Sequence, residues 1–476
     1  MPLGWTIILL GLAVAAGLFL WVWAVVDCLT NRGLSGSNKT VWFLVTLLLP
    51  VVGALAYRSV KPGEVTEFRG AWMIASSFVT FGISTGFPYY NISFFFPYFR
   101  DNHGWTQELV TTGAPIAVLL TIWAGPFIVP RVSPRLLIIV GTGLTFLSFQ
   151  WFGRLSGGEY EYYLCWCVYM FGYFLAGPIP HQIIVSNWYK ERRGLAMGIT
   201  YVGVGVVGAM GNRLSPWLAQ QIEYTEALQY MSFLLLLAWP MAFFIVKDRP
   251  QDVGQLPDGK KSEAEVVQTK LPTPKSFGFL ASKVPFWLLL VGSAASIGSI
   301  AAVNFLLQFV LEEQGFTDPA ARNAVWADAS SIYLISSIGG RLLAGYLADR
   351  FPRKWVMLVT YVIVAISIPL LFLITPEQPG FVYVFAICFG FALGADYMLI
   401  PLMAADQFGL ASLGKAMSAI LPSDTITQFW FPRIVAELRT IWGGYSYALW
   451  AVFGMAAFGA AAIALLPRHH KPVDED

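Results

Sequence analysis

Residues 284–311 read VPFWLLLVGSAASIGSIAAVNFLLQFVL, an apolar run without a charged side chain. A helix of this length crosses the hydrocarbon core of a bilayer, about 30 Å thick, with its backbone polar groups hydrogen-bonded internally. Similar apolar runs of roughly 20 residues recur about fourteen times, separated by short polar breaks. The sequence therefore predicts an all-α protein that crosses a membrane many times.

The overall composition supports this prediction. Hydrophobic residues make up 57% of the 476 residues and charged residues only 12%, and the mean hydropathy is +0.62. This leaves too little polar surface for a soluble globular protein. The four cysteines lie in or beside apolar runs and indicate neither a disulfide framework nor a zinc site. We expect no metal, no cofactor and no nucleic-acid partner.

The apolar runs fall into two groups. Two come first, at about 4–26 and 40–58, and twelve more follow, split into six and six by a break rich in Pro, Lys and Asp. The twelve are expected at roughly 71–99, 107–129, 134–152, 162–187, 194–220, 227–246, 284–311, 322–348, 354–374, 380–404, 414–438 and 442–466. The predicted domains are a two-helix transmembrane hairpin (1–60), a six-helix bundle (70–246), a cytoplasmic linker (247–283) and a second six-helix bundle (284–468).

The distribution of basic residues predicts the orientation in the membrane. Lys and Arg favour one set of alternate loops about three to one, which places those loops, and with them both termini, in the cytoplasm. The first apolar run lacks a basic leading segment and a small-residue cleavage site, so we expect a retained helix. A multi-pass protein of the plasma (inner) membrane follows from this pattern.

The two six-helix halves carry a weak internal repeat. HGWT at 103–106 corresponds to QGFT at 314–317, each after the first helix of its half. PFIVPRVSPR at 126–135 corresponds to GYLADRFPRK at 345–354, each after the second helix. Such duplication is typical of transporters built from two related bundles.

GYLADRFPRK resembles the loop between helices two and three of the major facilitator superfamily, G-x-L-x-D-R-x-G-R-R/K. The resemblance implies a twelve-helix major facilitator fold of two bundles. It also implies a conformational latch, in which charged side chains hold the bundles together; the candidate latch residues are Gly345, Asp349, Arg350, Arg353, Lys354, Arg131 and Arg135. In the first half Pro126 and Pro130 replace the glycine and aspartate of the motif.

Two further stretches narrow the resemblance. NWYKERRGLAMG at 187–198 and RPQDVGQLPDG at 249–259 are similar to segments of the monocarboxylate porter and oxalate/formate antiporter group. Together the similarity spans about residues 70–468. It implies a secondary active transporter of a small organic monoanion, proton-coupled and working by alternating access between the halves, whose partners are the anion, the proton and the lipid bilayer.

Residues 1–60 resemble a different family. Asp27 followed by WFLVTLLLPVVGALAY at 42–57 is similar to the two-helix module that precedes phospholipase D-nuclease and cardiolipin synthase domains. The resemblance implies a membrane anchor or a docking element for a membrane-protein partner. The H-x-K-x4-D pattern of phospholipase D chemistry occurs once, at His469, Lys471 and Asp476 on the terminal tail, and we interpret it as coincidence. We therefore expect no enzyme.

Charged residues inside predicted helices are the main candidates for chemistry, because a charge in mid-bilayer is costly and usually faces inward. The resemblance implies that Arg341 binds the substrate carboxylate, which suits its planar set of donors. The acid that many monocarboxylate porters carry four residues earlier is Ser337 here. The eleventh helix offers Asp424 and Gln428 in place of the lysine of oxalate antiporters, which favours a monoanion over a dianion.

Asp424 and Asp396 are candidates for proton coupling, or for neutralising Arg341 in the empty site; alternatively an aspartate and Arg341 form a fixed structural pair. His181 is a candidate proton relay or a satisfied structural residue. The remaining candidates for substrate binding are Tyr89 and Asn91, which follow Pro88, together with Asn304 and Arg213. Arg213 alternatively extends its charge to the membrane surface.

Two other functions remain open at this stage. One is a proton-coupled carrier of a neutral or cationic solute, with Asp396 and Asp424 as coupling acids. The other is a non-transporting membrane sensor or scaffold that interacts through residues 1–60. Uptake assays discriminate between these and the monoanion transporter.

Overall fold

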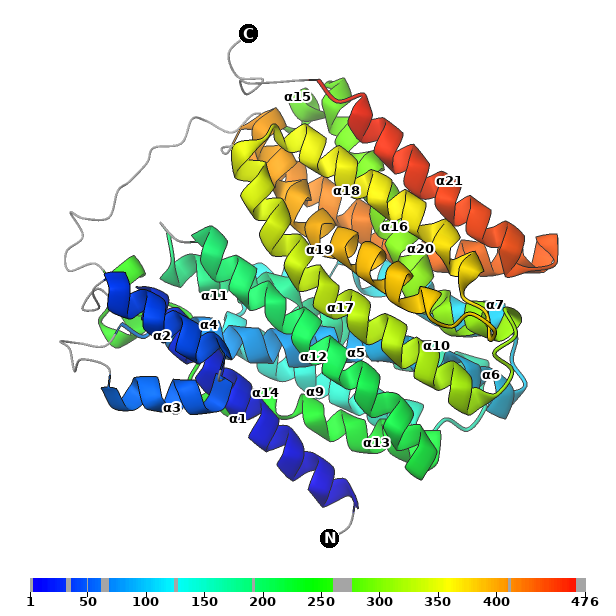
Figure 1. Ribbon diagram of the computed structural model, residues 1–476, viewed down its shortest axis with the longest axis horizontal. Coiled ribbons are helices and arrows are strands. Elements are labelled where there is room, and N and C mark those ends of the chain that lie inside the picture. Colours follow the sequence, from blue (N-terminus) through cyan, green and yellow to red (C-terminus); the bar gives the residue numbers. More distant parts are fainter. Residues whose placement is uncertain are drawn as a thin grey trace.

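The computed structural model describes residues 3–30, 36–48, 50–60, 68–123, 127–190, 193–259, 276–409 and 412–467, all in helices and connecting loops. The helices form a bundle in which a first half, α4 to α14, packs beside a second half, α16 to α21 (Figure 1). Within the described ranges ten helical segments, α1 among them, are long and apolar enough to cross a membrane. The predicted all-helical fold is confirmed.

The first half begins with a broken helix. Its pieces are α4 (Gly70–Phe81), the π-helical turn η1 (Gly82–Gly86), α5 (Phe87–Asn91), the 3-10 turn η2 (Ile92–Phe95) and α6 (Phe96–His103). Pro88 and Pro97 each lie near the start of a new piece, where a proline lacks the amide hydrogen that would continue the earlier turn. The pieces follow one another through the range 71–99 that the sequence predicts for the first bundle helix.

Five further segments complete this half. They are α7 (Gln107–Thr121), α9 (Pro134–Phe152), α10 (Glu159–Ala176) with α11 (Pro178–Trp188), α12 (Arg193–Gln221), and α13 (Tyr224–Leu235) with α14 (Ala238–Phe244). A short 3-10 turn, η3 (Val129–Arg131), precedes α9.

The second half follows a short helix, α15 (Phe277–Ala281), and supplies six segments. They are α16 (Val284–Glu313), α17 (Pro319–Arg350), α18 (Arg353–Ser367) continuing into the 3-10 turn η7 (Ile368–Leu373), α19 (Phe381–Phe408), α20 (Leu413–Trp442) and α21 (Tyr445–Ala464). Asp318 caps α17 by accepting from the amides of Ala320 and Ala321.

We call the end of the bundle that carries Arg135, Lys190 and Lys354 the basic end, and the opposite end, with the loops at 103–106 and 314–318, the far end. The start of the predicted linker is folded against the basic end as η4 (Pro250–Val253) and η5 (Pro257–Gly259). The Trp188 indole donates to the Lys247 carbonyl at 2.9 Å. Residues 260–275 of that linker lie outside the described residues.

The N-terminal segment has three helices: α1 (Leu3–Thr30), α2 (Gly36–Leu48) and α3 (Pro50–Val60). A Cβ on Gly53 would lie 2.5 Å from the carbonyl oxygen of Val45, although eight residues of continuous helix span about 12 Å. The chain therefore folds back before Pro50, which cannot continue the earlier helix. The predicted second crossing at 40–58 is corrected to a helical pair, because a crossing needs about 20 residues.

Helix α1 packs along the first half and fixes the position of the N-terminal end. A Cβ on Gly4 would touch the Tyr230 ring, and one on Gly11 would touch Leu234 and Leu237. The residue numbers of the contacting positions increase together along both helices, so α1 runs parallel to α13. Both run from the far end toward the basic end. Near the basic end its Trp23 ring lies 5.6 Å from that of Trp72 on α4.

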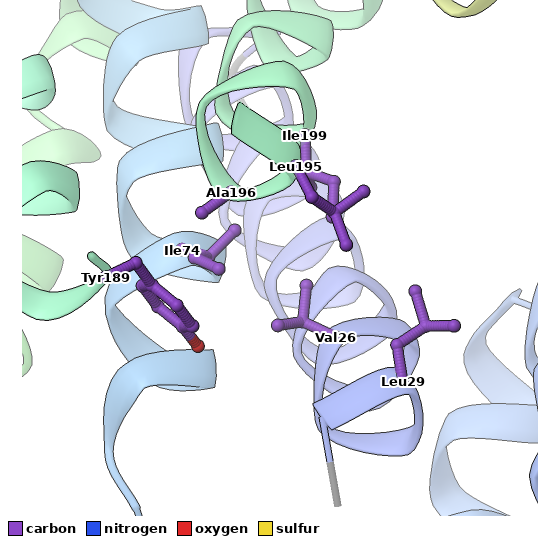
Figure 2. A pocket seen from close by; sticks show the side chains of 7 residues that line it. All are labelled: Val26, Leu29, Ile74, Tyr189, Leu195, Ala196 and Ile199. Atoms are coloured by element: carbon purple, nitrogen blue, oxygen red, sulfur yellow. The ribbon is translucent and has the colours of Figure 1, made fainter. Parts of the chain in front are cut away.

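At the basic end α1, α4 and α12 enclose a small apolar crevice. Figure 2 shows its lining, formed by Val26, Leu29, Ile74, Tyr189, Leu195, Ala196 and Ile199.

The two described chain ends lie at opposite ends of the bundle. Because the end of α1 lies at this crevice, the start of α1 lies at the far end. Helix α21 finishes at the basic end, where Lys354 Nζ donates to the Leu466 carbonyl at 2.5 Å. The prediction that both termini lie on one side is wrong for the described chain ends, because the α2 and α3 pair does not cross (Figure 1).

Candidate functional site

Polar contacts close the two halves against each other at the far end. Arg100 at the end of α6 binds Glu312 of α16 at 2.9 Å. Arg433 Nε of α20 donates to Thr112 Oγ1 of α7 at 2.6 Å. Because the paired helices belong to different halves, these contacts resist separation at this end.

An aromatic cluster lies deeper between the halves and is centred on Tyr89. Its ring centroid lies 5.4 Å from Phe305 of α16, 6.0 Å from Phe429 of α20 and 6.2 Å from Tyr173 of α10. Gln428 Nε2 donates to the Tyr89 hydroxyl at 2.6 Å. The predicted substrate residue Tyr89 thus lies at the interface of the halves, where it contributes to closing the far-end side.

Arg341 of α17 lies on the basic-end side of this cluster. Its side chain is buried, and Nη1 donates to the backbone carbonyl of Tyr201 on α12 at 2.9 Å. The approach is close because Gly205 on α12 has no side chain; a Cβ there would lie 3.7 Å from Arg341 Nη1. An arginine has five N–H donors, and the donors of Arg341 that bind no described residue are not sealed from solvent. The guanidinium can therefore accept another ligand.

Asp424 and Asp396 do not pair with Arg341 in this structure. Ser293 Oγ donates to Asp424 Oδ1 and Ser296 Oγ donates to Asp396 Oδ2, each at 2.7 Å. Both aspartates are buried among α16, α19 and α20, inside the second half. Arg341 instead faces the first half. The fixed pair that the sequence left open as an alternative is not formed.

His181 is fully buried with both ring nitrogens in hydrogen bonds. Nδ1 lies 2.8 Å from the Gly177 carbonyl, so it carries the hydrogen, and Nε2 lies 3.0 Å from Thr80 Oγ1. The imidazole also stacks on Phe81, with ring centroids 4.8 Å apart. This environment suits a structural histidine within the first half.

The amide side chains and Arg213 lie in different places. Asn91 accepts from Ser215 at 2.7 Å and donates to the Phe87 carbonyl at 2.8 Å, both inside the first half. Asn304 accepts from the Tyr333 hydroxyl. Arg213 forms an ion pair of 2.5 Å with Asp328 of α17 and keeps 54% of its side chain exposed. It stands twelve residues, about 18 Å of helix, from Tyr201, so the structure does not bring it to Arg341.

The family model described as Major Facilitator Superfamily matches residues 131–327 and 324–476. The chain belongs to the Major Facilitator Superfamily. A second model, Phospholipase_D-nuclease N-terminal, matches residues 19–57, in agreement with the resemblance of the N-terminal segment.

Relatives within the superfamily are transporters. An MFS-type transporter of Gibberella moniliformis is 25% identical over 73% of this chain and 79% of its own length. The oxalate:formate antiporter of Oxalobacter formigenes is 22% identical over 79% of this chain and 86% of its own length. Three further fungal transporters match over about half of their own length. The protein is therefore a membrane transporter rather than an enzyme, and its substrate is a small solute.

A solved structure shows the same fold at low sequence identity. A mutant form of the nucleoside transporter NupG superposes with a TM-score of 0.61 and 12% identity, covering 84% of this chain and 99% of that chain. The likeness covers the twelve-helix architecture and supports no statement about the solute.

The latch residues with described side chains make their contacts within their own halves. In the second half Arg353 pairs with Asp406 of α19 at 2.5 Å, and Arg350 lies 4.2 Å above the Tyr346 ring. A Cβ on Gly345 would lie 3.4 Å from the Met398 side chain. The side chain of Asp349 lies outside the described residues.

The first half keeps its basic latch residues on nearby backbone. The Arg135 amide donates to Asp248 Oδ1 at 2.9 Å and its Nη2 donates to the Phe243 carbonyl at 2.5 Å. Arg131 donates to the Phe127 carbonyl, also at 2.5 Å. These bonds hold α9 against the end of α14 and do not cross between the halves.

Sequence reasoning missed several residues at the interface of the halves, namely Tyr173, Tyr201, Phe305 and Phe429. All four are aromatic, and aromatic residues are common in this chain, so their spacing carries no signal. Tyr201 acts through its backbone carbonyl, which any residue provides. The run of glycines around Gly205 could have indicated the close approach of another helix there.

Proposed function

We propose that this protein is a proton-coupled secondary active transporter of a small organic monoanion in the plasma membrane, with the basic end in the cytoplasm. The observation that carries the proposal is the environment of Arg341. Its guanidinium is a buried cation, and its hydrogen bond to a described residue is the one to the Tyr201 backbone carbonyl. A buried charge is costly unless it is paired. A carboxylate that occupies the site would satisfy the guanidinium with two parallel hydrogen bonds.

The arrangement of the halves supports alternating access. Contacts between the halves extend from Arg100 and Glu312 at the far end to Arg341 and Tyr201. We infer that, with the far-end side closed, the anion reaches Arg341 from the basic end, which corresponds to a cytoplasm-facing conformation. Rocking of the halves would break the far-end contacts and release or admit the anion outside.

Two observations support the class of substrate. The relative from Oxalobacter formigenes is an oxalate:formate antiporter, which favours a small carboxylate. In this chain Arg341 has no second buried cation beside it among the described residues, since Arg213 is engaged by Asp328. A single cation balances one negative charge.

The test is uptake into proteoliposomes. Labelled formate, lactate and pyruvate are offered separately with an inward pH gradient, with and without an uncoupler. We expect accumulation of at least one anion that the uncoupler abolishes. Arg341→Gln should lose this uptake, whereas Arg154→Gln, which changes an exposed arginine of a far-end loop, should retain it. Uptake that is equal in both variants would refute the anion site.

A carrier of a neutral or cationic solute is the second candidate. The ring cluster around Tyr89 favours it, because aromatic faces attract cations and apolar solutes. Absence of anion uptake combined with pH-dependent uptake from a panel of neutral and cationic solutes would select this function.

A further inference from the structure

The two buried aspartates of the second half are neighbours. Ser293 and Ser296 stand three residues apart on α16, so their side chains lie on the same face about 5–6 Å apart. Each serine hydroxyl donates to one carboxylate, Ser293 to Asp424 and Ser296 to Asp396, at 2.7 Å. The carboxylates of α19 and α20 therefore lie side by side against one face of α16.

The charged residues on the surrounding helices lie elsewhere. Apart from Asp424, the charged residues of α16, α18 and α20 stand toward the helix ends, and Arg433 is nine residues, about 14 Å of helix, from Asp424. They are Glu312, Glu313, Arg353, Lys354, Lys415, Arg433, Glu437 and Arg439. On α19 Asp406 is bound to Arg353, and on α17 Arg341 is bound to the Tyr201 carbonyl. Helix α21 contains no charged residue. Within the described residues the aspartate pair thus has no basic partner.

Two buried polar atoms at the pair lack a partner. Tyr361 of α18 faces Asp396 and Ser296, yet neither its hydroxyl nor Asp396 Oδ1 makes a hydrogen bond of good geometry with a described residue. Both side chains are fully buried. Unmet buried donors and acceptors are costly. Two adjacent carboxylates without a cation cannot both be ionised in such a place, so one of them keeps a proton.

We infer that Asp396 and Asp424, with Ser293, Ser296 and Tyr361, form one proton-binding site inside the second half, separate from Arg341. The pair holds a proton in common. The two serines donate hydrogen bonds to the carboxylates, and the Tyr361 hydroxyl is the nearby donor available to Asp396. Loss of the proton leaves two negative charges against α16 and repels α19 from α20. The site is thus a proton-dependent contact between helices.

The coupling of this site to the anion site rests on the proposed function and follows from the packing of α17 on α19. A Cβ on Gly394 would lie 1.9 Å from the Ser337 carbonyl oxygen, and one on Gly340 would lie 2.0 Å from that of Phe391. Backbones in such close contact move together. Asp396 stands two residues after Gly394, and Arg341 one turn after Ser337. A proton on the pair is therefore communicated to Arg341 through α19 and α17.

A test that needs no substrate measures thermal stability against pH in the purified protein. The folded pair holds a proton that unfolded carboxyls, with a pKa of about 3.9, have lost at neutral pH. Folding therefore takes up a proton, and stability must fall as the pH rises. We expect Asp396→Asn and Asp424→Asn to reduce this fall, because an amide does not titrate, while Glu377→Gln, on an exposed loop, keeps the wild-type slope.

Two results would overturn the proton site. One is an unchanged pH slope in both asparagine variants. The other is stabilisation by sodium chloride over choline chloride at high pH that the asparagine variants lose, which would identify a sodium ion as the ligand. Anion uptake does not enter this test, so it can succeed or fail independently of the proposed function.

Transport assays distinguish proton coupling from anion binding once a transported anion has been identified. With one proton per anion, a gradient of one pH unit supports about tenfold accumulation. Asp396→Asn and Asp424→Asn should each reduce the ratio to one, and the double variant should do no worse, because the pair acts as a unit. Equilibrium exchange of labelled anion should continue in all three. Tenfold accumulation in either single variant would refute the coupling role.

Discussion

At the scale of single residues, the cation and the acids expected in one network occupy different surroundings. Arg341 faces the first half and binds a backbone carbonyl, whereas Asp396 and Asp424 face the interior of their own half and bind serines. Separate sites allow a proton and an anion to be present together without neutralising each other directly. Coupling then has to be mechanical, through helices.

The shape of the Arg341 side chain should matter as well as its charge. Arg341→Lys keeps a cation but loses the planar pair of donors. We expect anion affinity to fall by about 1.5–3 kcal/mol, the range for a hydrogen bond to a charged group, measured by calorimetric titration of the transported anion. Arg154→Lys serves as the matched control. Wild-type affinity in a folded Arg341→Lys protein would contradict bidentate binding.

The sequence could identify charged residues in apolar helices but not the direction in which each one faces. The sequence identifies Arg341 by its place just before the GYLADRFPRK loop. The structure places its side chain in a buried position. Its contact with Tyr201 depends on residues 140 positions apart, which no local pattern records. For the same reason the serines that bind the aspartates looked like ordinary small residues of α16.

At the scale of elements, the N-terminal segment departs most from the prediction. The run at 40–58 has the length of a crossing helix, and a hydropathy window cannot distinguish one long helix from two short ones that fold back. Pro50 is the decisive residue, because the chain turns just before it. The twelve later segments were predictable because each apolar run is long and is bounded by polar residues.

The α1 to α3 unit should depend on the contact between Tyr57 and Asp27. The Tyr57 hydroxyl donates to Asp27 Oδ2 at 2.8 Å in a buried position, joining α3 to α1. Tyr57→Phe should weaken this unit by about 1.5–3 kcal/mol and speed amide hydrogen exchange in α2 and α3, measured by mass spectrometry. Transport per folded molecule should not change, since both six-helix halves lie after this unit.

Tyr160→Phe provides the control for that experiment, because Tyr160 is 89% exposed. Equal exchange rates in Tyr57→Phe and wild type would show that the bond does not hold the unit together. Lost transport in a well-folded Tyr57→Phe protein would show instead that the unit belongs to the transport machinery.

At the scale of the whole molecule, the start of α1 and the end of α21 lie at opposite ends of the bundle, so we expect them on opposite faces of the membrane. In a cysteine-free background, Thr6→Cys and Ser156→Cys should react with an impermeant maleimide in intact cells. Lys190→Cys, at the basic end, should react only after permeabilisation. Labelling of the Ser156→Cys variant but not of the Thr6→Cys variant would indicate that the N-terminal end lies in the cytoplasm.

The far-end contacts should set the balance between the two conformations. Glu312 of α16 binds Arg100 of the first half at 2.9 Å and lies 3.5 Å from Arg322 of its own half. Glu312→Gln removes the charge that attracts Arg100 across the interface and leaves Arg322 without its anion. Because Glu312 is partly exposed, the loss is about 1 kcal/mol, or about a fivefold shift toward far-end opening.

Spin labels at Ser156 and Glu377, exposed far-end positions of the two halves, report this shift as a longer distance in double electron-electron resonance. Glu226→Gln is the matched control, because Glu226 is an exposed acid in the first turn of α13, at the far end of the first half. A longer distance only in Glu312→Gln shows that the far-end ion pair holds the cytoplasm-facing state closed outside. An unchanged distribution, or an equal change in Glu226→Gln, would show that this ion pair does not hold the far end closed.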